Sequence, residues 1–190
     1  MATSKALFVL CTLTLFLSLS VYATQTPPSR VYGDFYRTSC PEAESVIAKA
    51  AKAQLDKNLK HAAGLIRMAF HDCFVEVCDG SVLLDGKDIG KNAAINVNLL
   101  GLDVIEAAKT AVEAVCPGVV SCADIFANAA RDSTVKLNGA GGVVQGGRKD
   151  DTVPSAAPAK NDLPLPPFYV SQLIDSFAKR DHSTEQMVIV

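Results

Sequence analysis

The sequence contains no cluster of basic residues, no internal repeat or low-complexity stretch, and no Asn-x-Ser/Thr acceptor. Without a patch of Lys and Arg, nucleic acid is not expected as a partner, because binding to phosphate backbones depends on such a patch. The missing acceptor excludes N-linked glycosylation. Tryptophan is absent and only three histidines occur, at positions 61, 71 and 182.

One apolar stretch, residues 6–21, follows Lys5 and ends just before Ala23. A basic start, a short apolar core and small residues near a cleavage point are typical of a secretory signal. A membrane anchor is the alternative, but spanning a bilayer takes about 20 apolar residues and this stretch is shorter. We therefore expect a signal peptide at residues 1–23. Its removal would take away one lysine and no acid, which moves the formal charge from −2 to −3 and leaves residues 24–190 as one domain without a membrane segment.

Six cysteines are present, and Cys11 would leave with the signal. The remaining chain then holds an odd number of cysteines. In an oxidising compartment, the leftover cysteine implies a partner elsewhere or a free thiol.

Apolar residues recur at helical spacing along most of the chain, which predicts an all-α fold. A capping pattern at Ser39 and Glu42 predicts the start of a first helix, and Ser121 with Asp124 repeats that pattern for a fourth helix ending near residue 131. Between them we expect helices over residues 61–73 and 102–115. Residues 139–147 should be irregular or form a short strand, residues 162–167 should be extended, and a last helix should cover residues 169–179.

Arg67 and His71 are four residues apart on the second predicted helix, so their side chains share one face. A neutral imidazole can take a proton from a bound peroxide and return it to the departing oxygen. A guanidinium, which is always cationic, can stabilise the negative charge that develops there. Taken alone, however, this spacing favours a surface pair or a buried structural histidine.

The residues around this pair carry a resemblance. Six segments match in order: Tyr36-x-x-x-Cys40-Pro41, Arg67-Met-Ala-Phe-His-Asp-Cys-Phe-Val75 with Cys78-Asp-Gly-Ser-Val-Leu-Leu84, Cys116-Pro-Gly-Val-Val-Ser-Cys-Ala-Asp124, Ala129-Ala-Arg-Asp132, Gly147-Arg-Lys-Asp150 and Leu163-Pro-x-Pro166. With these segments, residues 30–190 resemble plant secretory (class III) haem peroxidases. The resemblance implies the distal portion of the haem-peroxidase helical fold.

The resemblance also implies roles for individual residues. His71 would be the distal acid and base, Arg67 the charge stabiliser, and Phe70 a neighbour of the haem. Asn96 would orient His71 through its other ring nitrogen. Pro164 would help to hold small aromatic reductants, although an ordinary linker proline is the alternative.

A calcium site in the loop after His71 is implied by the same resemblance. Its ligands would be Asp72, Val75, Val77, Asp79 and Ser81, which offer the oxygen atoms that calcium prefers. A solvated acidic loop is one alternative, and zinc bound by His71, Cys73 and Cys78 is another. The resemblance pairs Cys40 with Cys116 and Cys73 with Cys78, and it leaves Cys122 unpaired.

The sequence departs from the family at its end, where Val190 precedes the position of the proximal Ser-Gly-x-His segment, and Gly142 stands at a usual tryptophan. We therefore expect a distal half without the family's iron-ligating histidine. The implied function is reduction of hydrogen peroxide with oxidation of small phenolic donors, using haem b and calcium. An inactive secreted remnant, disulfide-bonded and able to bind calcium, or an incomplete gene model, is the alternative. The protein would be a monomer in the extracellular space or cell wall, with the vacuole as the alternative.

Overall fold

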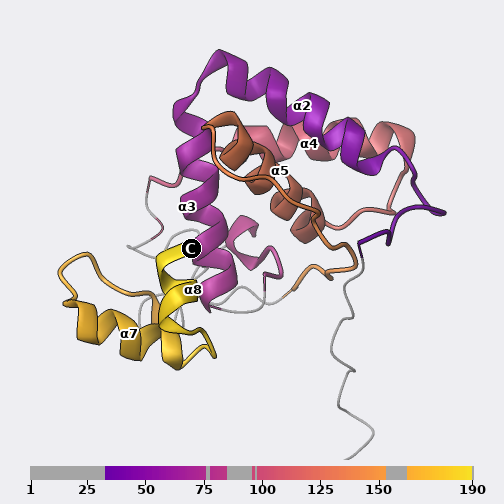
Figure 1. Cartoon of the computed structure of the whole chain (residues 1–190). Coiled ribbons are helices and arrows are strands. Elements are labelled where there is room, and N and C mark those ends of the chain that lie inside the picture. Colours follow the sequence, from indigo (N-terminus) through magenta and orange to yellow (C-terminus); the bar gives the residue numbers. More distant parts are fainter. Residues whose placement is uncertain (1–32, 76–77, 85–95, 97, 153–161, 190) are drawn as a thin grey trace, which may run out of the picture.

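The computed structural model describes residues 33–75, 78–84, 96, 98–152 and 162–189 (Figure 1). The predicted signal at residues 1–23 and the predicted calcium ligand Val77 lie outside these ranges. No helix in the described ranges is long and apolar enough to cross a membrane.

The described residues form helices connected by turns and loops, and they contain no extended strand, so the all-α prediction is confirmed. In chain order the elements are α2 (Ala43–Lys57), α3 (Lys60–Val75), the short 3-10 helix η1 (Ser81–Leu83), α4 (Leu102–Val115), α5 (Cys122–Lys136), α7 (Val170–Ala178) and α8 (Thr184–Ile189). Residues 139–147, for which a short strand was one expectation, are irregular apart from an isolated bridge at Gly146.

Helices α2, α3, α4 and α5 pack around the main core, with α5 against both α2 and α3 (Figure 1). The fully buried side chains of this core come from all four helices, as apolar stripes at helical spacing require. They include Ile47, Leu55, Leu65, Met68, Val104, Val112 and Ile125. A second, smaller cluster joins the C-terminal end of α3 to α7 through Phe74, Val75, Leu163 and Phe177. This second cluster fixes the end of α3 that carries His71.

The helix starts only partly match the predicted caps. Ser121 caps α5 as predicted, because its Oγ accepts the Asp124 N–H at 3.1 Å. The predicted Ser39 cap is wrong: α2 begins at Ala43, and its N-terminal Glu42 makes no side-chain cap. Residues 33–39 form turns, and the Cys40 N–H donates to the Tyr36 carbonyl at 2.9 Å, so the chain before Pro41 closes locally and does not enter the helix.

Helix α5 continues past the predicted end near residue 131 to Lys136. The hydroxyls of Ser133 and Thr134 donate to carbonyls one turn earlier, at 2.8 and 3.1 Å, so these polar residues remain compatible with the helix. The six-residue α8 was not predicted, since it buries no residue and therefore leaves no apolar stripe in the sequence.

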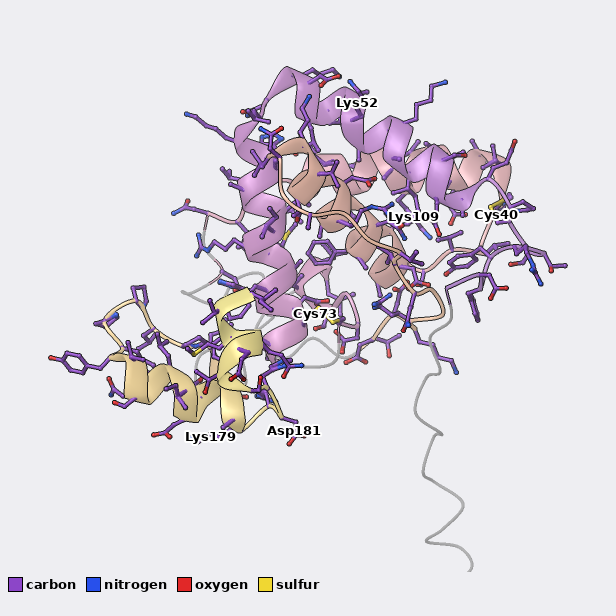
Figure 2. All side chains as sticks on the ribbon, viewed as in Figure 1. Cys40, Lys52, Cys73, Lys109, Lys179 and Asp181 are labelled. Atoms are coloured by element: carbon purple, nitrogen blue, oxygen red, sulfur yellow. A yellow bond between two sulfur atoms is a disulfide. The ribbon has the colours of Figure 1, made fainter. Side chains whose placement is uncertain are left out.

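Two disulfides cross-link the fold, and both predicted pairings are confirmed. Cys40 is bonded to Cys116, with their Cα atoms 6.0 Å apart, and Cys73 is bonded to Cys78. Figure 2 shows that the two bridges lie in different regions: Cys40 is near the start of α2, whereas Cys73 is near the C-terminal end of α3. Cys122 belongs to neither bridge and is half-buried.

A buried carboxylate on α5 holds three separate segments together. The Asp124 side chain is fully buried; it accepts hydrogen bonds from the Tyr36 hydroxyl at 2.5 Å and from the Gly147 N–H at 2.6 Å. The Arg148 guanidinium lies 3.1 Å from its other oxygen. Burial, followed by the neighbouring carboxylate, raises the pKa of Tyr36 to about 12, so the phenol stays protonated and donates.

Substitution of Asp124 by asparagine should therefore lower the free energy of unfolding by about 3 kcal/mol, because it leaves the largely buried Arg148 cation without its counter-charge. Urea denaturation monitored by circular dichroism measures this change. Asp34→Asn is the matched control, since it removes an exposed ion pair with Arg37. We expect the control to change stability by no more than about 0.5 kcal/mol. Equal stabilities for the two variants would contradict the prediction.

Candidate active site

Helix α3 presents Arg67 and His71 one turn apart, as the sequence predicts. The helix is anchored in the core by Leu65 and Met68, both fully buried. His71 is 8% exposed, whereas Arg67 lies on the surface. The rigid helix therefore fixes the spacing between an almost buried imidazole and an accessible guanidinium.

Asn96 holds the His71 ring from outside the helix. Its Oδ1 lies 2.6 Å from the His71 Nδ1, and both residues are buried. Because an amide oxygen can only accept, this bond places the ring proton on Nδ1 in the neutral form and leaves Nε2 unprotonated. Burial lowers the pKa of His71; Asn96 opposes this by raising it, and the Arg67 charge lowers it further. The ring is therefore neutral and able to act as a base at Nε2.

An aromatic cluster supports the helix beside this pair. The Phe70 ring lies 4.9 Å from that of Phe74 and stacks on Phe177 of α7, with ring centroids 6.0 Å apart. Phe74 and Phe177 are themselves 4.8 Å apart. Sequence reasoning did not single out Phe177, although Leu173, Ile174 and Phe177 recur at the spacing of a helix face that turns towards the core.

The loop after α3 folds back onto the Asp72 carboxylate. Its two oxygens accept the N–H groups of Gly80 and Val82 at 3.0 and 3.2 Å. The pKa of Asp72 is raised to about 6, mainly by burial; the two backbone hydrogen bonds oppose this rise, and the negative charges of Asp79 and Asp150 add to it. The loop thus concentrates acidic oxygens directly after His71.

A family model described as Peroxidase matches residues 46–190. The chain belongs to the peroxidase family. A basic peroxidase of Zinnia elegans is 48% identical over 154 residues, which are 81% of this chain and 48% of the relative. Peroxidase 71 of Arabidopsis thaliana is 43% identical over 188 residues, 95% of this chain and 57% of the relative.

Peroxidase N1 of Nicotiana tabacum is similar as well, at 47% identity over 156 residues, 81% of this chain and 46% of the relative. These relatives confirm the resemblance to plant peroxidases. The chain spans about half the length of the curated relatives it matches.

Within this peroxidase chain, the zinc alternative fails on chemistry. Cys73 and Cys78 are joined in a disulfide, so neither is available as a thiolate ligand. In the described ranges, no group of three or more His, Cys, Asp or Glu side chains could hold a metal ion. A metal in the loop would therefore depend on backbone and hydroxyl oxygens as well as carboxylates, which is the donor set of calcium.

Pro164 is half-buried in the segment between the described residues Asp162 and α7. The preceding Leu163 packs into the aromatic cluster that includes Phe74, so this segment lies at the same end of α3 as His71. An ion pair between Asp162 and Arg180, with nitrogen and oxygen 2.6 Å apart, ties the segment to the end of α7. The structure thus places the segment that carries Pro164 beside the C-terminal end of α3, next to Phe74.

Proposed function

We propose that this chain supplies the peroxide-binding side of a plant haem peroxidase, which reduces hydrogen peroxide and oxidises small phenolic donors. The observation that carries the proposal is the hydrogen bond between His71 and Asn96, with Arg67 one turn earlier on α3. This bond leaves a neutral imidazole with its unprotonated nitrogen available, beside a permanent positive charge. Membership of the peroxidase family supports the assignment.

The residues of this chain would act through proton transfer and charge. His71 Nε2 would accept the proton from one peroxide oxygen and deliver it to the other, which leaves as water. Arg67 would stabilise the negative charge on the departing oxygen. Haem b, when bound, supplies the iron and the two electrons that cleavage of the O–O bond consumes, and phenolic donors held near Pro164 would return them one at a time.

The described residues fit one wall of a haem pocket. Phe70 provides an aromatic surface with its ring centroid 6.3 Å from that of His71, which suits an apolar macrocycle. The other two histidines make other contacts: His61 lies 3.1 Å from the Asp103 carboxylate, and the His182 ring packs against Phe177. We therefore propose neither of these two histidines as the ligand of the haem iron.

Haem reconstitution tests the proposed function directly. The chain should take up haemin with a Soret band distinct from that of free haemin. It should then oxidise a small phenol faster than free haemin does at the same peroxide concentration. Absence of both the shifted band and the added turnover would overturn the proposal for this chain.

We also propose that calcium binds the loop formed by Asp72, Val75, Val77, Asp79 and Ser81, of which Val77 lies outside the described residues. Support comes from the repulsion among Asp72, Asp79 and Asp150, which a cation would relieve. The oxygen donors are hard ligands of the kind that calcium takes in sets of six to eight. By bracing the residues after His71, the ion would stabilise the end of α3.

Calcium should accordingly raise the thermal midpoint of the chain. At a calcium concentration about 100-fold above the dissociation constant, the stabilisation is about 2.7 kcal/mol, or roughly 5–10 °C for a chain of this size. Calorimetry with calcium and with a chelator measures the shift, and Asp79→Asn should abolish it while the exposed Asp34→Asn should not. A calcium-independent midpoint in the unsubstituted chain would refute the site.

Secretion is the third part of the proposal. The two disulfides support an oxidising compartment, because such bridges are rare in the reducing cytosol. The expected signal at residues 1–23 points to the same route, toward the extracellular space or cell wall.

A further inference from the structure

Helix α3 and the chain entering α4 approach each other at two glycines. A Cβ added to Gly64 would lie 2.6 Å from both the carbonyl oxygen and the Cβ of Leu100. A Cβ added to Gly101, whose φ is +104°, would lie 2.6 Å from Cγ of Leu65 and 3.2 Å from the His61 carbonyl oxygen. All three distances of 2.6 Å are shorter than any ordinary contact, so the crossing requires that positions 64 and 101 carry no side chain.

This crossing lies on the same face of α3 as the catalytic imidazole. Gly64 and His71 are seven residues apart, which is about two helical turns and roughly 10 Å along the axis. Leu100 lies four positions after Asn96, and the Leu99 N–H donates to the Asn96 carbonyl at 3.3 Å in a turn. The segment thus meets α3 twice, at Gly64 through Leu100 and at His71 through Asn96.

We propose that Gly64 is a positioning residue for His71, acting through Leu100 and Asn96, with Gly101 holding the other side of the crossing. The inference rests on the role proposed above for the His71–Asn96 pair. Close contact at Gly64 sets the distance between α3 and the turn that carries Asn96. That distance in turn sets the hydrogen bond that fixes the His71 tautomer.

The size of the expected displacement decides the outcome. An ordinary van der Waals contact begins at 3.4 Å, so alanine at position 64 must push the Leu100 backbone away by close to 1 Å. Added to the present 2.6 Å between Nδ1 and Oδ1, such a shift reaches the limit of a hydrogen bond, about 3.5 Å. Alanine is a better helix former than glycine, so helix propensity alone would stabilise α3. It therefore cannot cause the loss of the hydrogen bond between His71 and Asn96.

The test measures the His71 tautomer by ¹H–¹⁵N correlation spectra of the ¹⁵N-histidine-labelled chain. The unsubstituted chain should be almost entirely in the Nδ1–H form. Gly64→Ala should raise the Nε2–H to Nδ1–H ratio about fivefold, the factor expected when one hydrogen bond is lost. Asn96→Ala should give the same ratio, and adding Gly64→Ala to it should change nothing further. Gly142→Ala is the matched control, because its Cβ would meet nothing within 4 Å.

A second variant covers the case in which Gly64→Ala does not fold. Leu100→Gly removes the Cβ that faces Gly64 and loosens the segment, and the Leu100 side chain is 45% exposed, so the core remains intact. We expect the Nε2–H form to increase here as well. A folded Gly64→Ala chain with the unsubstituted tautomer ratio overturns the proposal, as does an unchanged ratio in Leu100→Gly. Because the readout needs neither haem nor peroxide, failed turnover would refute the proposed function without altering this result.

Discussion

Replacement of His71 by alanine should lower the rate of peroxide-dependent phenol oxidation by the haem-loaded chain about 10²–10⁴-fold, the usual contribution of a positioned acid and base. The reason lies in the geometry: Asn96 leaves the His71 Nε2 as the proton acceptor, and α3 provides no second imidazole within one turn. Stopped-flow mixing with hydrogen peroxide measures this rate of phenol oxidation.

His61→Ala is the matched control for that substitution. His61 is on the same helix, but it contacts Asn58 at 2.9 Å and the Asp103 carboxylate, away from the distal pair. Its replacement should leave the rate within about twofold, because it removes no group from the reacting site. Similar rate losses in the two variants would contradict the assignment of His71.

The rate of peroxide-dependent phenol oxidation should decrease in acidic solution. Only neutral His71 can accept a proton, so the rate should fall as pH drops through the pKa of the ring. Burial lowers that pKa below the 6.5 of an ordinary histidine, so activity should persist into more acidic solution than an exposed imidazole would allow. Asn96→Ala removes an interaction that raises the pKa, and it should therefore move the acid limb to still lower pH.

Loss of the Cys40–Cys116 disulfide should lower the free energy of unfolding by about 4 kcal/mol, a value set by the entropy of closing so long a loop. The bridge joins residues 76 positions apart, and Cys40 is buried in the main core. Since domains are stable by only about 5–15 kcal/mol, this is a large fraction of the total. Chemical denaturation of a Cys40→Ser/Cys116→Ser chain under non-reducing conditions measures the loss.

The other cysteines provide graded comparisons. The Cys73–Cys78 bridge spans only five positions, so removing it should cost about 2 kcal/mol in the same model. Cys122→Ser should change stability by less than about 0.5 kcal/mol, because it breaks no bridge. If the double serine variant at Cys40 and Cys116 lost less than the variant of the short bridge, loop length would not be the controlling factor.

The helices of the main core could be predicted because each has an apolar stripe. For α4 the buried residues Val104, Ile105, Ala108 and Val112 recur at helical spacing, and the predicted bounds match those observed. The start of α2 could not be predicted in the same way. Its position depends on turns around Tyr36, which closes onto Asp124 from 88 positions away, and no local pattern encodes that contact.

In the candidate site, too, some residues could be predicted from local spacing and others could not. Local helical geometry places Arg67 and His71 on one face, but Asn96 is 25 positions from His71 and was found only through the family resemblance. The support from Phe177 and the close contact at Gly64 were not predicted, because both arise where distant segments meet. Residues on one helix can be placed from their spacing in the sequence. The residues that position them come from distant segments and can be identified only in the folded structure.

The bridge between Cys40 and Cys116 also determines what a protease can release from the chain. Every residue of the distal constellation, from Arg67 through Asn96, lies between these two cysteines and therefore inside a covalent ring. A single peptide-bond cleavage between Cys78 and Asn96 would open the ring but would not separate the resulting fragments. The nicked protein would keep His71 and Asn96 in one covalently connected molecule, and only reduction would release the two pieces.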